Sequence, residues 1–219
     1  MQKYLDIFSR CPLFEGIQPA EMPAMLGCIG AQLREYGRNE IIFSEGDPAR
    51  QMGIVLRGSA QIIKEDYYGR RSIVASVQPG ELFGESFACA QVEQLPVSVI
   101  AAERSEILLV DCHRITITCS SACSFHNRMI LNLLHVVAEK NLIFNRKVEI
   151  LSRRSTREKL MTYLMNQAKQ QESARFTIPF DRQELADYLG VERSALSAEI
   201  SKLRNEGILE ANRSQFTLL

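Results

Sequence analysis

The sequence lacks any long apolar run. No window of its 219 residues approaches the ~20 apolar residues that a membrane-spanning helix needs. The first ten residues mix Gln, Lys, Asp and Arg among the apolar positions, so they form neither the apolar core of a signal peptide nor a basic transit peptide. With 46% apolar and 24% charged residues, the chain has the composition of a globular protein. We therefore expect a cytoplasmic protein.

The sequence also lacks a regular cysteine framework. Its six cysteines fall at positions 11, 28, 89, 112, 119 and 123, with no CxxC pair. An iron-sulfur cluster needs several closely spaced cysteines, and only Cys119 and Cys123 are near each other in the sequence. A thiol switch at that pair is an alternative, but thiols four residues apart on a helix meet badly for a disulfide. We expect inert or partly buried thiols.

Histidine is absent from residues 1–112. A metalloenzyme built on a β barrel needs His and carboxylate ligands inside the barrel, so the sequence argues against an enzyme. We identify no catalytic residue, metal ligand or cofactor. We interpret His113 as a turn residue and His126 and His135 as helix-surface positions. The formal net charge of zero excludes a protein that coats nucleic acid through a large positive field, so any such binding must use a local surface.

A β-rich segment extends from about Gln32 to Asp111. Glycines at 37, 46, 58, 69 and 80 fall nine to twelve residues apart, and the runs between them are rich in Ile, Val and Leu. Short strands with turn signals at this spacing indicate an all-β sandwich or barrel. The runs that we expect to form strands are 40–43, 53–56, 60–63, 72–77, 97–101 and 106–110.

A long helix is predicted after residue 120. Residues 125–152 contain no Gly and no Pro, and apolar residues recur there with helical spacing. Two columns with a seven-residue repeat resemble the d and a positions of a parallel coiled coil, with Asn141 as the polar residue that fixes register. We expect a dimer interface, the alternative being a helix face that packs on the β domain. The interface residues would be Ile130, Leu134, Val137, Asn141, Phe144 and Val148.

The C-terminal segment predicts two helices joined by a tight turn. Ser155 and Glu158 form a capping box that begins a helix running to about Ala168, and residues 175–179 favour a short strand. Asp181 and Glu184 form a second such box, and Gly190 ends that helix. A further helix begins near Glu192 or Arg193. The segments 208–209 and 216–219 flank the turn 212–214 as a hairpin, the candidate wing.

The outward positions of the second helix carry short or polar side chains with one long bidentate donor, Arg193, in the first turn. A helix that lies in the major groove of DNA has this composition. The alternative is a helical hairpin without a DNA role. The candidate DNA-binding residues are Arg193, Ser194, Ser197, Ala198, Ser201, Lys202, Arg182 and Arg213.

Three segments together resemble the Crp/Fnr superfamily of bacterial regulators along essentially the whole chain. They are the opening Cys11–Gly16 (CPLFEG), Pro79–Ser86 (PGELFGES) and the region from Arg182 to Leu209. The resemblance implies an α+β chain: an N-terminal double-stranded β-helix roll like cyclic-nucleotide-binding domains, a long dimerisation helix, and a C-terminal winged helix-turn-helix. The expected boundaries are 1–120 for the sensor domain, 121–152 for the helix and 153–219 for the DNA-binding domain.

The sequence departs from the family pattern at two sites. Members that bind cyclic nucleotides place an Arg-Ser or Arg-Thr pair where this chain has Leu95 and Pro96, which cannot donate to a cyclic phosphate. The family also commonly has Glu and a second Arg where this chain has Ser194 and Ala198, so a different half-site is expected. The resemblance places the effector pocket at Gly84, Glu85, Ser86, Leu95, Pro96 and Ser98.

The sequence therefore predicts a transcription regulator that binds an inverted-repeat operator as a homodimer. Its roll would sense an effector that the sequence does not identify, other than cyclic AMP. RNA polymerase is a further expected partner. The alternatives are a cyclic-nucleotide-binding regulatory module and a regulator that senses redox state through thiols or an iron-sulfur cluster.

Overall fold

The computed structural model describes residues 2–65, 67–68, 71–116 and 124–219, and these divide into two compact units. The first unit is Met1–Glu139 and the second is Lys140–Leu219. The division falls inside one continuous helix, α5 (Ser124–Leu151), so each unit contains part of that helix. Among the described residues, none of the helices combines the length and the apolar character that crossing a membrane would require.

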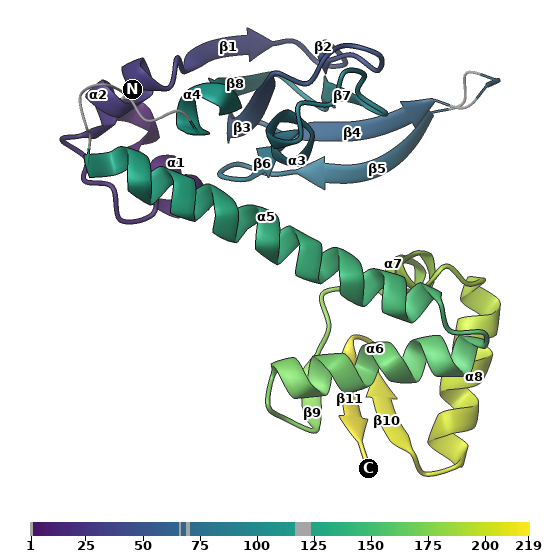
Figure 1. Cartoon of the computed structure of the whole chain (residues 1–219). Helices are drawn as coiled ribbons and strands as arrows, with labels where there is room; N and C mark the ends of the chain where they lie inside the picture. The colour runs from purple at the N-terminus through teal and green to yellow at the C-terminus, as the bar shows by residue number, and fades with distance from the viewer. Residues whose placement is uncertain (1, 66, 69–70, 117–123) are drawn as a thin grey trace. The chain divides into compact units, whose positions relative to one another are not determined.

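The first unit is a β roll flanked by short helices (Figure 1). Two 3₁₀ helices, Gln2–Tyr4 and Pro12–Phe14, lie near its N-terminus. Its other helices are α1 (Leu5–Arg10), α2 (Met22–Cys28), α3 (Glu85–Cys89), α4 (Cys112–Thr116) and the first part of α5. Its strands are β1 (Gln32–Tyr36), β2 (Ile41–Phe43), β3 (Gln51–Arg57), β4 (Ala60–Glu65), β5 (Arg71–Val77), β6 (Leu82–Phe83), β7 (Ser98–Ala101) and β8 (Ser105–Asp111).

Two four-stranded antiparallel sheets form the roll. The strand orders are β1-β8-β3-β6 and β2-β7-β4-β5, so each sheet joins strands from distant parts of the sequence. One apolar cluster, which includes Val55, Val99 and Ile107, fills the roll, and a second joins the N-terminal helices to β3, β8 and α5. The turn from β3 to β4 requires glycine, because Gly58 has φ +77° and a Cβ there would lie 2.6 Å from the Arg104 carbonyl oxygen.

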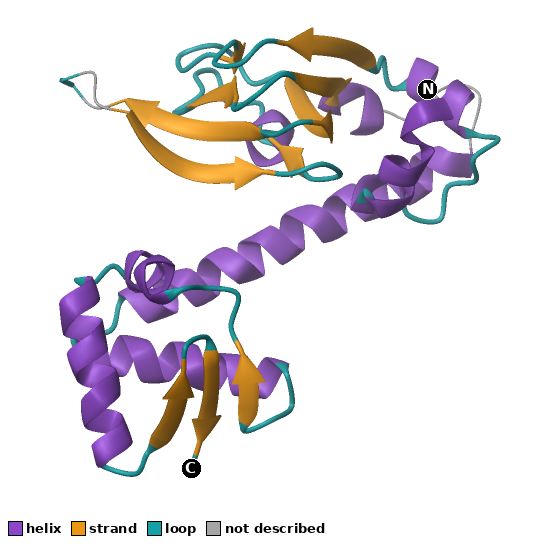
Figure 2. Ribbon diagram, turned by 180° about the vertical axis from the view of Figure 1, so that it is seen from behind, coloured by secondary structure: helices purple, strands orange, loops and turns teal. Residues whose placement is uncertain are grey.

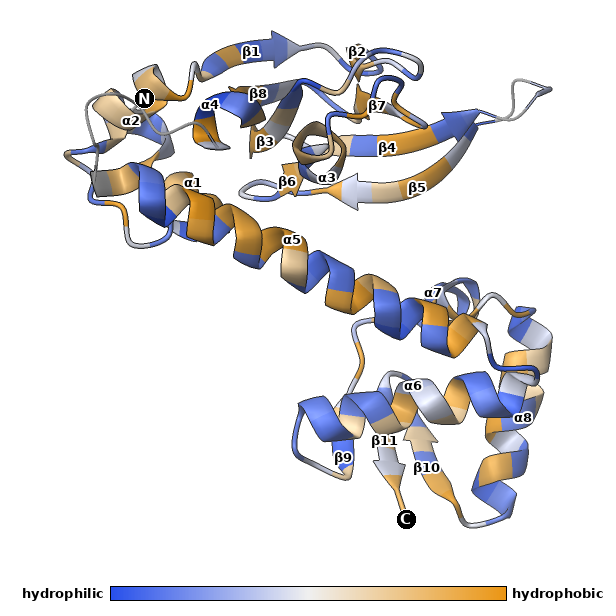
Figure 3. Ribbon diagram, in the orientation of Figure 1, coloured by the Kyte–Doolittle hydropathy of each residue, from blue (hydrophilic) through white to orange (hydrophobic). Residues whose placement is uncertain are grey.

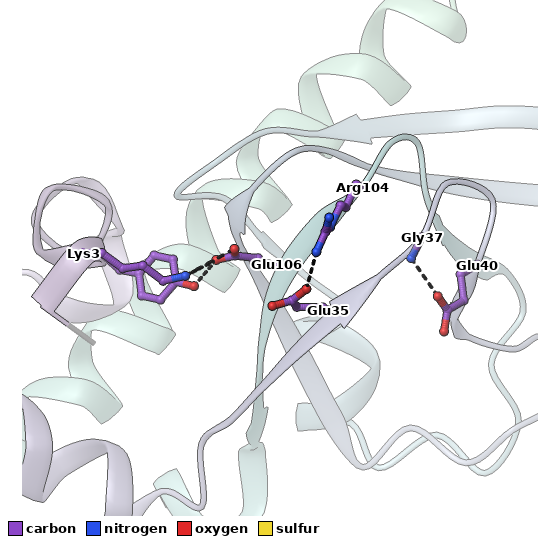
Figure 4. A network of polar contacts seen from close by, with 7 residues as sticks. Lys3, Glu35, Gly37, Glu40, Arg104 and Glu106 are labelled. Atoms are coloured by element: carbon purple, nitrogen blue, oxygen red, sulfur yellow. Dashed lines mark hydrogen bonds and ion pairs between the residues drawn. The ribbon is translucent and has the colours of Figure 1, made fainter.

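Polar contacts join the N-terminus to β8 and stabilise the loop between β1 and β2 (Figure 4). Lys3 Nζ lies 3.2 Å from Glu106 Oε2, and the Tyr4 hydroxyl donates to the same carboxylate. Arg104 donates to Glu35 at 3.0 Å, and the backbone N–H of Gly37 donates to Glu40 at 2.7 Å. The shared Glu106 side chain therefore joins β8 to the first residues of the chain.

One face of α5 packs on the roll. Met129, Leu133 and Val136 are buried in the cluster that contains the N-terminal helices, and Ile130 and Val137 pack against its edge. The Asn132 amide donates to the carbonyls of Leu13 and Glu15 at 3.0 and 2.9 Å. These contacts explain why residues 124–139 belong to the first unit, whereas the sequence suggested a separate helical segment.

The second unit is a winged helix-turn-helix (Figure 2). Helix α6 (Thr156–Gln170) packs with α7 (Arg182–Leu189) and α8 (Arg193–Asn205). A three-stranded sheet, in the order β10-β11-β9, completes the unit. Its strands are β9 (Arg175–Thr177), β10 (Leu209–Asn212) and β11 (Gln215–Leu218). The expected fold class is confirmed.

The local sequence signals mark the helix ends correctly. Both expected capping boxes are present, at Ser155 with Glu158 and at Asp181 with Glu184. The first of these helices is longer than predicted, since α6 continues to Gln170. The six expected strands are all present. The strands β1 and β6 and the helices α1, α2, α3 and α4 were not foreseen, because each has only two to seven residues.

Candidate nucleic-acid interface and ligand pocket

The α7–α8 pair is built on a reciprocal cap and a left-handed glycine. The Glu184 backbone N–H donates to Asp181 Oδ1 at 2.8 Å, and the Asp181 N–H donates to Glu184 Oε2 at 2.7 Å. Gly190 then ends α7 with φ +60°, a conformation that favours glycine. These features fix the tight turn that sets where α8 begins.

Apolar residues of α7, α8 and the turn between them form one core. Leu185, Ala186, Leu189, Leu196 and Ile200 are all buried, and Val191 packs at the edge of the cluster. The small Ala186 side chain lies in this core, where the crossing helices leave little room. Burial of this set fixes which side of α8 faces solvent.

The opposite side of α8 is open. Arg193, Ser194, Ala198, Ser201 and Lys202 are exposed, and Ser197 is half-buried. The Ser201 hydroxyl donates to the Ser197 carbonyl at 3.0 Å, which leaves its oxygen as an acceptor toward solvent. The residues predicted to contact DNA from this helix therefore share one solvent-facing surface.

Three arginines from different elements line one hollow of about 450 Å³. Arg182 comes from the start of α7, Arg193 from the start of α8 and Arg213 from the β10–β11 turn. The hollow is completed by Asp181, Gln183 and Ser214. The structure thus brings together three of the predicted DNA-binding residues from two helices and the wing.

Arg182 is held in a defined position within this hollow. Its guanidinium lies 5.7 Å from the centroid of the Phe216 ring and donates to the Arg213 carbonyl at 3.4 Å. Partial burial, followed by the positive charge of Arg193, lowers the pKa of Arg182. Two cations that repel each other at a partly desolvated surface are stabilised by an anion, so the hollow is suited to a phosphate group.

The residues of the predicted ligand pocket lie at the start of α3 and in and just before β7. Gly84 has φ +75° and precedes α3, Glu85 is buried, and Ser86 is exposed. Ser98 Oγ accepts a hydrogen bond from the Glu45 N–H at 2.9 Å, and Pro96 is exposed. The predicted pocket residues therefore differ in exposure, from the buried Glu85 to the exposed Ser86 and Pro96.

A cavity of about 380 Å³ lies in the same region of the roll. Of the six predicted pocket residues it includes Leu95, and the other five are not in its lining. The residues that line it are Ile42, Phe43, Asp47, Pro48, Ala49, Arg50, Gln51, Leu95 and Asp111. The backbone of Leu95 is fixed by hydrogen bonds with Asp47 and Gly46, at 2.8 and 2.9 Å. Sequence reasoning missed Arg50, Asp47 and Asp111, the charged groups of this cavity.

The predicted dimer-interface residues of α5 differ in how far they are exposed to solvent. Leu134, Asn141, Phe144 and Val148 are exposed, whereas Ile130 and Val137 are partly covered by the roll. Leu131, Leu142 and Ile143 are also exposed, and hydrophobic residues recur along the helix (Figure 3). Of the predicted interface residues, Leu134, Asn141, Phe144 and Val148 are therefore accessible to a second chain, and the dimer interface stays a prediction.

The assignment of His126 to the helix surface is wrong. His126 is buried, and its Nε2 lies 3.2 Å from the Arg114 carbonyl oxygen, to which it donates in the matching tautomer. His135 is exposed on α5, as expected, and His113 lies in α4 rather than in a turn. The buried imidazole joins α4 to the first turn of α5.

Of the four described cysteines, Cys11 and Cys112 are buried and Cys28 is half-buried, in keeping with the expectation, whereas Cys89 is not. Cys89 at the end of α3 is exposed, and its Sγ lies 3.9 Å from the Sγ of buried Cys112 at the start of α4. No spacing signal could have identified this pair, because 22 residues separate the two cysteines in the sequence. Cys119 and Cys123 lie outside the described residues. Within the described part of the chain, no three His, Cys, Asp or Glu side chains gather as a metal site would require.

Comparisons with known proteins agree with both units. Residues 33–119 match the cyclic nucleotide-binding domain model, and residues 158–219 match the Crp-like helix-turn-helix domain model. The chain is 26% identical over 201 residues to the Cyclic AMP receptor protein of Thermus thermophilus, covering 90% of this chain and 88% of that protein. It is 24% identical over 215 residues to the nitrogen fixation regulation protein FixK of Azorhizobium caulinodans, covering 94% and 80%.

A solved structure supports the fold independently. The crystal structure of the Thermus thermophilus catabolite activator protein aligns with a TM-score of 0.56 at 24% identity, over 95% of this chain and 93% of that chain. The alignment therefore includes the roll, the long helix and the winged helix-turn-helix.

Proposed function

Because the chain belongs to the Crp/Fnr family of DNA-binding transcription regulators and carries a cyclic-nucleotide-binding-like sensory domain, we propose that it binds an inverted-repeat operator as a homodimer. The convergence of Arg182, Arg193 and Arg213 at the start of α8 carries this proposal. Its partners would be double-stranded DNA, a second copy of the chain, an effector of the roll and RNA polymerase, in the cytoplasm. No catalytic role is proposed.

In this proposal Arg193 reads the base sequence. It is the one long donor in the first turn of the exposed face of α8, and an arginine there can donate two hydrogen bonds to a guanine edge. The other outward side chains of α8 are too short to reach deep into the major groove; they are Ser194, Ser197, Ala198 and Ser201. They would allow the helix to approach the groove closely.

The remaining cations would contact the DNA backbone. Arg182 and Arg213 flank Arg193 in the same hollow, and Lys202 lies farther along α8. Phosphate contacts position a protein on DNA without discriminating sequence, and they make affinity depend on salt. Mutual repulsion between Arg182 and Arg193 would be relieved by a phosphate, which favours this role for the hollow.

Dimerisation would use the exposed face of α5. Leu134, Phe144 and Val148 are large apolar side chains on a helix face that water covers in the single chain. Burial of such a stripe stabilises association by several kcal/mol, at ~25 cal/mol per Å². Asn141, whose Oδ1 accepts from the Asn145 amide at 2.8 Å, would provide the polar position that fixes register.

The effector of the roll is proposed to be something other than cyclic AMP, and no resident cofactor is proposed. Leu95 and Pro96 offer no donor to a cyclic phosphate, whose buried charge would then lack a partner. The cavity beside Leu95 contains Arg50 together with Asp47 and Asp111. This mixed charge suits an uncharged or carboxylate-bearing ligand that meets Arg50.

Selection of binding sites from a random DNA library with the full-length protein tests the proposal. We expect inverted repeats whose half-site centres lie about one helical turn, ~34 Å, apart. Each half-site should contain a guanine that Arg193→Ala no longer selects. Recovery of non-palindromic sites would contradict the dimeric arrangement, and an unchanged guanine preference in Arg193→Ala would contradict the placement of the reading residue.

A further inference from the structure

Cys89 and Cys112 come from two chain segments that pack side by side, the end of α3 and the start of α4. Their Sγ atoms are 3.9 Å apart, and Cys89 is exposed whereas Cys112 is buried. One sulfur can therefore meet a solute while the other stays protected beside it. This division suits a reactive thiol with a resolving thiol.

Small molecules can reach the exposed Cys89 thiol, and a hollow lies next to both cysteines in the sequence. Ala88 and Asp111, which immediately precede the two cysteines, line the same hollow of about 390 Å³. The hydrogen bond between the Cys89 and Cys112 thiols lowers the pKa of Cys89 to about 7 despite the opposing effects of partial burial and Glu85. The same contact, together with burial, raises the pKa of Cys112, so Cys112 keeps its proton. Cys11, by contrast, is buried, and burial raises its pKa to about 11.

We propose that Cys89 and Cys112 are a hydroperoxide-reactive dithiol that closes to a disulfide between α3 and α4. Disulfide closure requires a sulfur separation of about 2.05 Å, so the sulfurs must approach by roughly 1.9 Å. Rotation of the exposed Cys89 side chain, at the last residue of a five-residue helix, provides this movement.

The chemistry is balanced with hydrogen peroxide as the oxidant. The Cys89 thiolate attacks one peroxide oxygen, the O–O bond breaks, and the departing hydroxide takes the proton that Cys89 released, giving water and a sulfenic acid. The Cys112 sulfur then attacks the Cys89 sulfur. The S–O bond breaks, and the hydroxyl leaves as water with the Cys112 proton. Two electrons pass from the two sulfurs to one peroxide, which becomes two waters.

The disulfide would connect the sensor region to the dimer helix. Helix α3 begins at Glu85 of the predicted pocket, and α4 contacts α5 through the hydrogen bond from His126 to the Arg114 carbonyl. Closure of the bond would fix α3 against α4 and so restrain the start of α5. The regulatory consequence, a change in DNA affinity, rests on the proposed function, whereas the disulfide itself does not.

The chemical test uses the full-length chain, reduced and kept under anaerobic conditions before addition of hydrogen peroxide. Mass mapping of peptides should identify a Cys89–Cys112 disulfide that a dithiol reductant reverses. Cys28→Ser, a matched control, should form the same link. Peroxide should remove two thiols per chain from the parent and none from Cys89→Ser, so Cys89→Ser should keep five thiols and the parent four. Links through Cys119 or Cys123 in place of this pair, or equal thiol loss in Cys89→Ser, would overturn the proposal.

A measurement on a Cys112 variant tests whether Cys89 is the thiol that attacks the peroxide. Replacement of buried Cys112 by Ala should allow the Cys89 sulfenic acid to accumulate and react with dimedone, whereas the parent should show little adduct. If Cys112→Ala does not fold, Cys89→Ser still decides the matter, because it alters an exposed side chain. Absence of dimedone adduct on folded Cys112→Ala would contradict Cys89 as the attacking thiol.

The regulatory consequence is measured with the selected operator. Oxidised parent protein should differ at least tenfold in operator affinity from reduced protein, and Cys89→Ser should not respond to peroxide. A mapped disulfide with unchanged affinity would overturn the regulatory consequence alone. Lack of specific DNA binding by the reduced protein would instead contradict the proposed function and leave the mapped disulfide intact.

Discussion

The Arg157 guanidinium of α6 donates to both carboxylate oxygens of Glu206, the C-cap residue that follows α8, at 3.1 and 2.6 Å. Glu199 Oε1 lies 3.6 Å from the same guanidinium. A two-point contact of this kind sets direction as well as distance. It therefore fixes the C-terminal end of α8 against α6, while the first turn of α8 stays open to a partner.

The ion pair predicts a pH-dependent contribution to folding. Arg157 lowers the pKa of Glu206 below its ordinary value of 4.5. A depressed folded-state pKa contributes stability above the ordinary value, and this contribution is lost as the pH falls through the folded-state pKa. Arg157→Met should therefore destabilise the protein at pH 7 and have no effect at acid pH where Glu206 is protonated. Urea unfolding at both pH values measures this, and an equal loss at acid pH would assign the effect to packing.

Replacement of Arg193 should remove most of the sequence preference. One bidentate arginine–guanine contact contributes about 1 to 3 kcal/mol of discrimination, and a dimer uses it twice, so Arg193→Ala should weaken specific binding by about 2 to 6 kcal/mol. Non-specific binding should fall much less. Arg193→Lys keeps the charge without the two-point contact and is the matched control. Equal losses on specific and non-specific DNA would assign Arg193 to phosphate contacts.

The proposed dimer should dissociate when its α5 face is altered at positions that the roll does not cover. Leu134→Glu combined with Phe144→Glu places charges on exposed positions of α5 and should give monomers by light scattering. Val137 is a poorer choice because it packs against the core of the roll. His135→Glu, one residue away on an exposed position, should remain dimeric. A dimeric double variant would place the interface elsewhere.

Cyclic AMP should not bind with micromolar affinity. Titration calorimetry on the full-length protein should show no heat attributable to binding, because Leu95 and Pro96 cannot pair with the cyclic phosphate. Leu95→Arg with Pro96→Ser restores a guanidinium and a backbone N–H, and should increase affinity by about tenfold or more, as expected for a charge-assisted hydrogen bond. Micromolar binding by the unaltered chain would refute this prediction.

Alkylation of Cys89 should follow a titration with a midpoint near pH 7. The Cys112 hydrogen bond lowers the pKa of Cys89 to about 7, so the reactive thiolate is already abundant at neutral pH. Quantification of the modified Cys89 peptide after brief iodoacetamide treatment gives the midpoint. In Cys112→Ala the midpoint should move upward, toward the ordinary thiol value of about 8.5. An unchanged midpoint would exclude Cys112 as the cause.

Local signals explain what could be predicted from the sequence. A capping box involves residues three apart, so Ser155 with Glu158 and Asp181 with Glu184 located two helix starts without tertiary information. Gly190 marked the turn because glycine readily adopts the left-handed conformation that ends a helix. The solvent-facing side of α8 followed, because its buried residues recur with helical period.

Contacts between distant segments explain what could not be predicted. The Cys89–Cys112 contact depends on two five-residue helices that carry no periodic signal. His126 is polar on a helix that looked exposed, and its burial depends on where α4 lies. The roll also decides which of the predicted α5 interface residues are exposed. It partly covers Ile130 and Val137 but leaves Leu134 exposed.

Helix α5 passes from one unit to the other through nine consecutive exposed residues, 138–146. Within a single chain this stretch has little beyond its own backbone hydrogen bonds to keep it helical, and short helices held in that way are marginal in water. Amide hydrogens there should exchange with solvent quickly in dilute protein and slowly in concentrated protein, because a second chain would protect them by mass action. The order of this segment would then report the concentration of the protein itself.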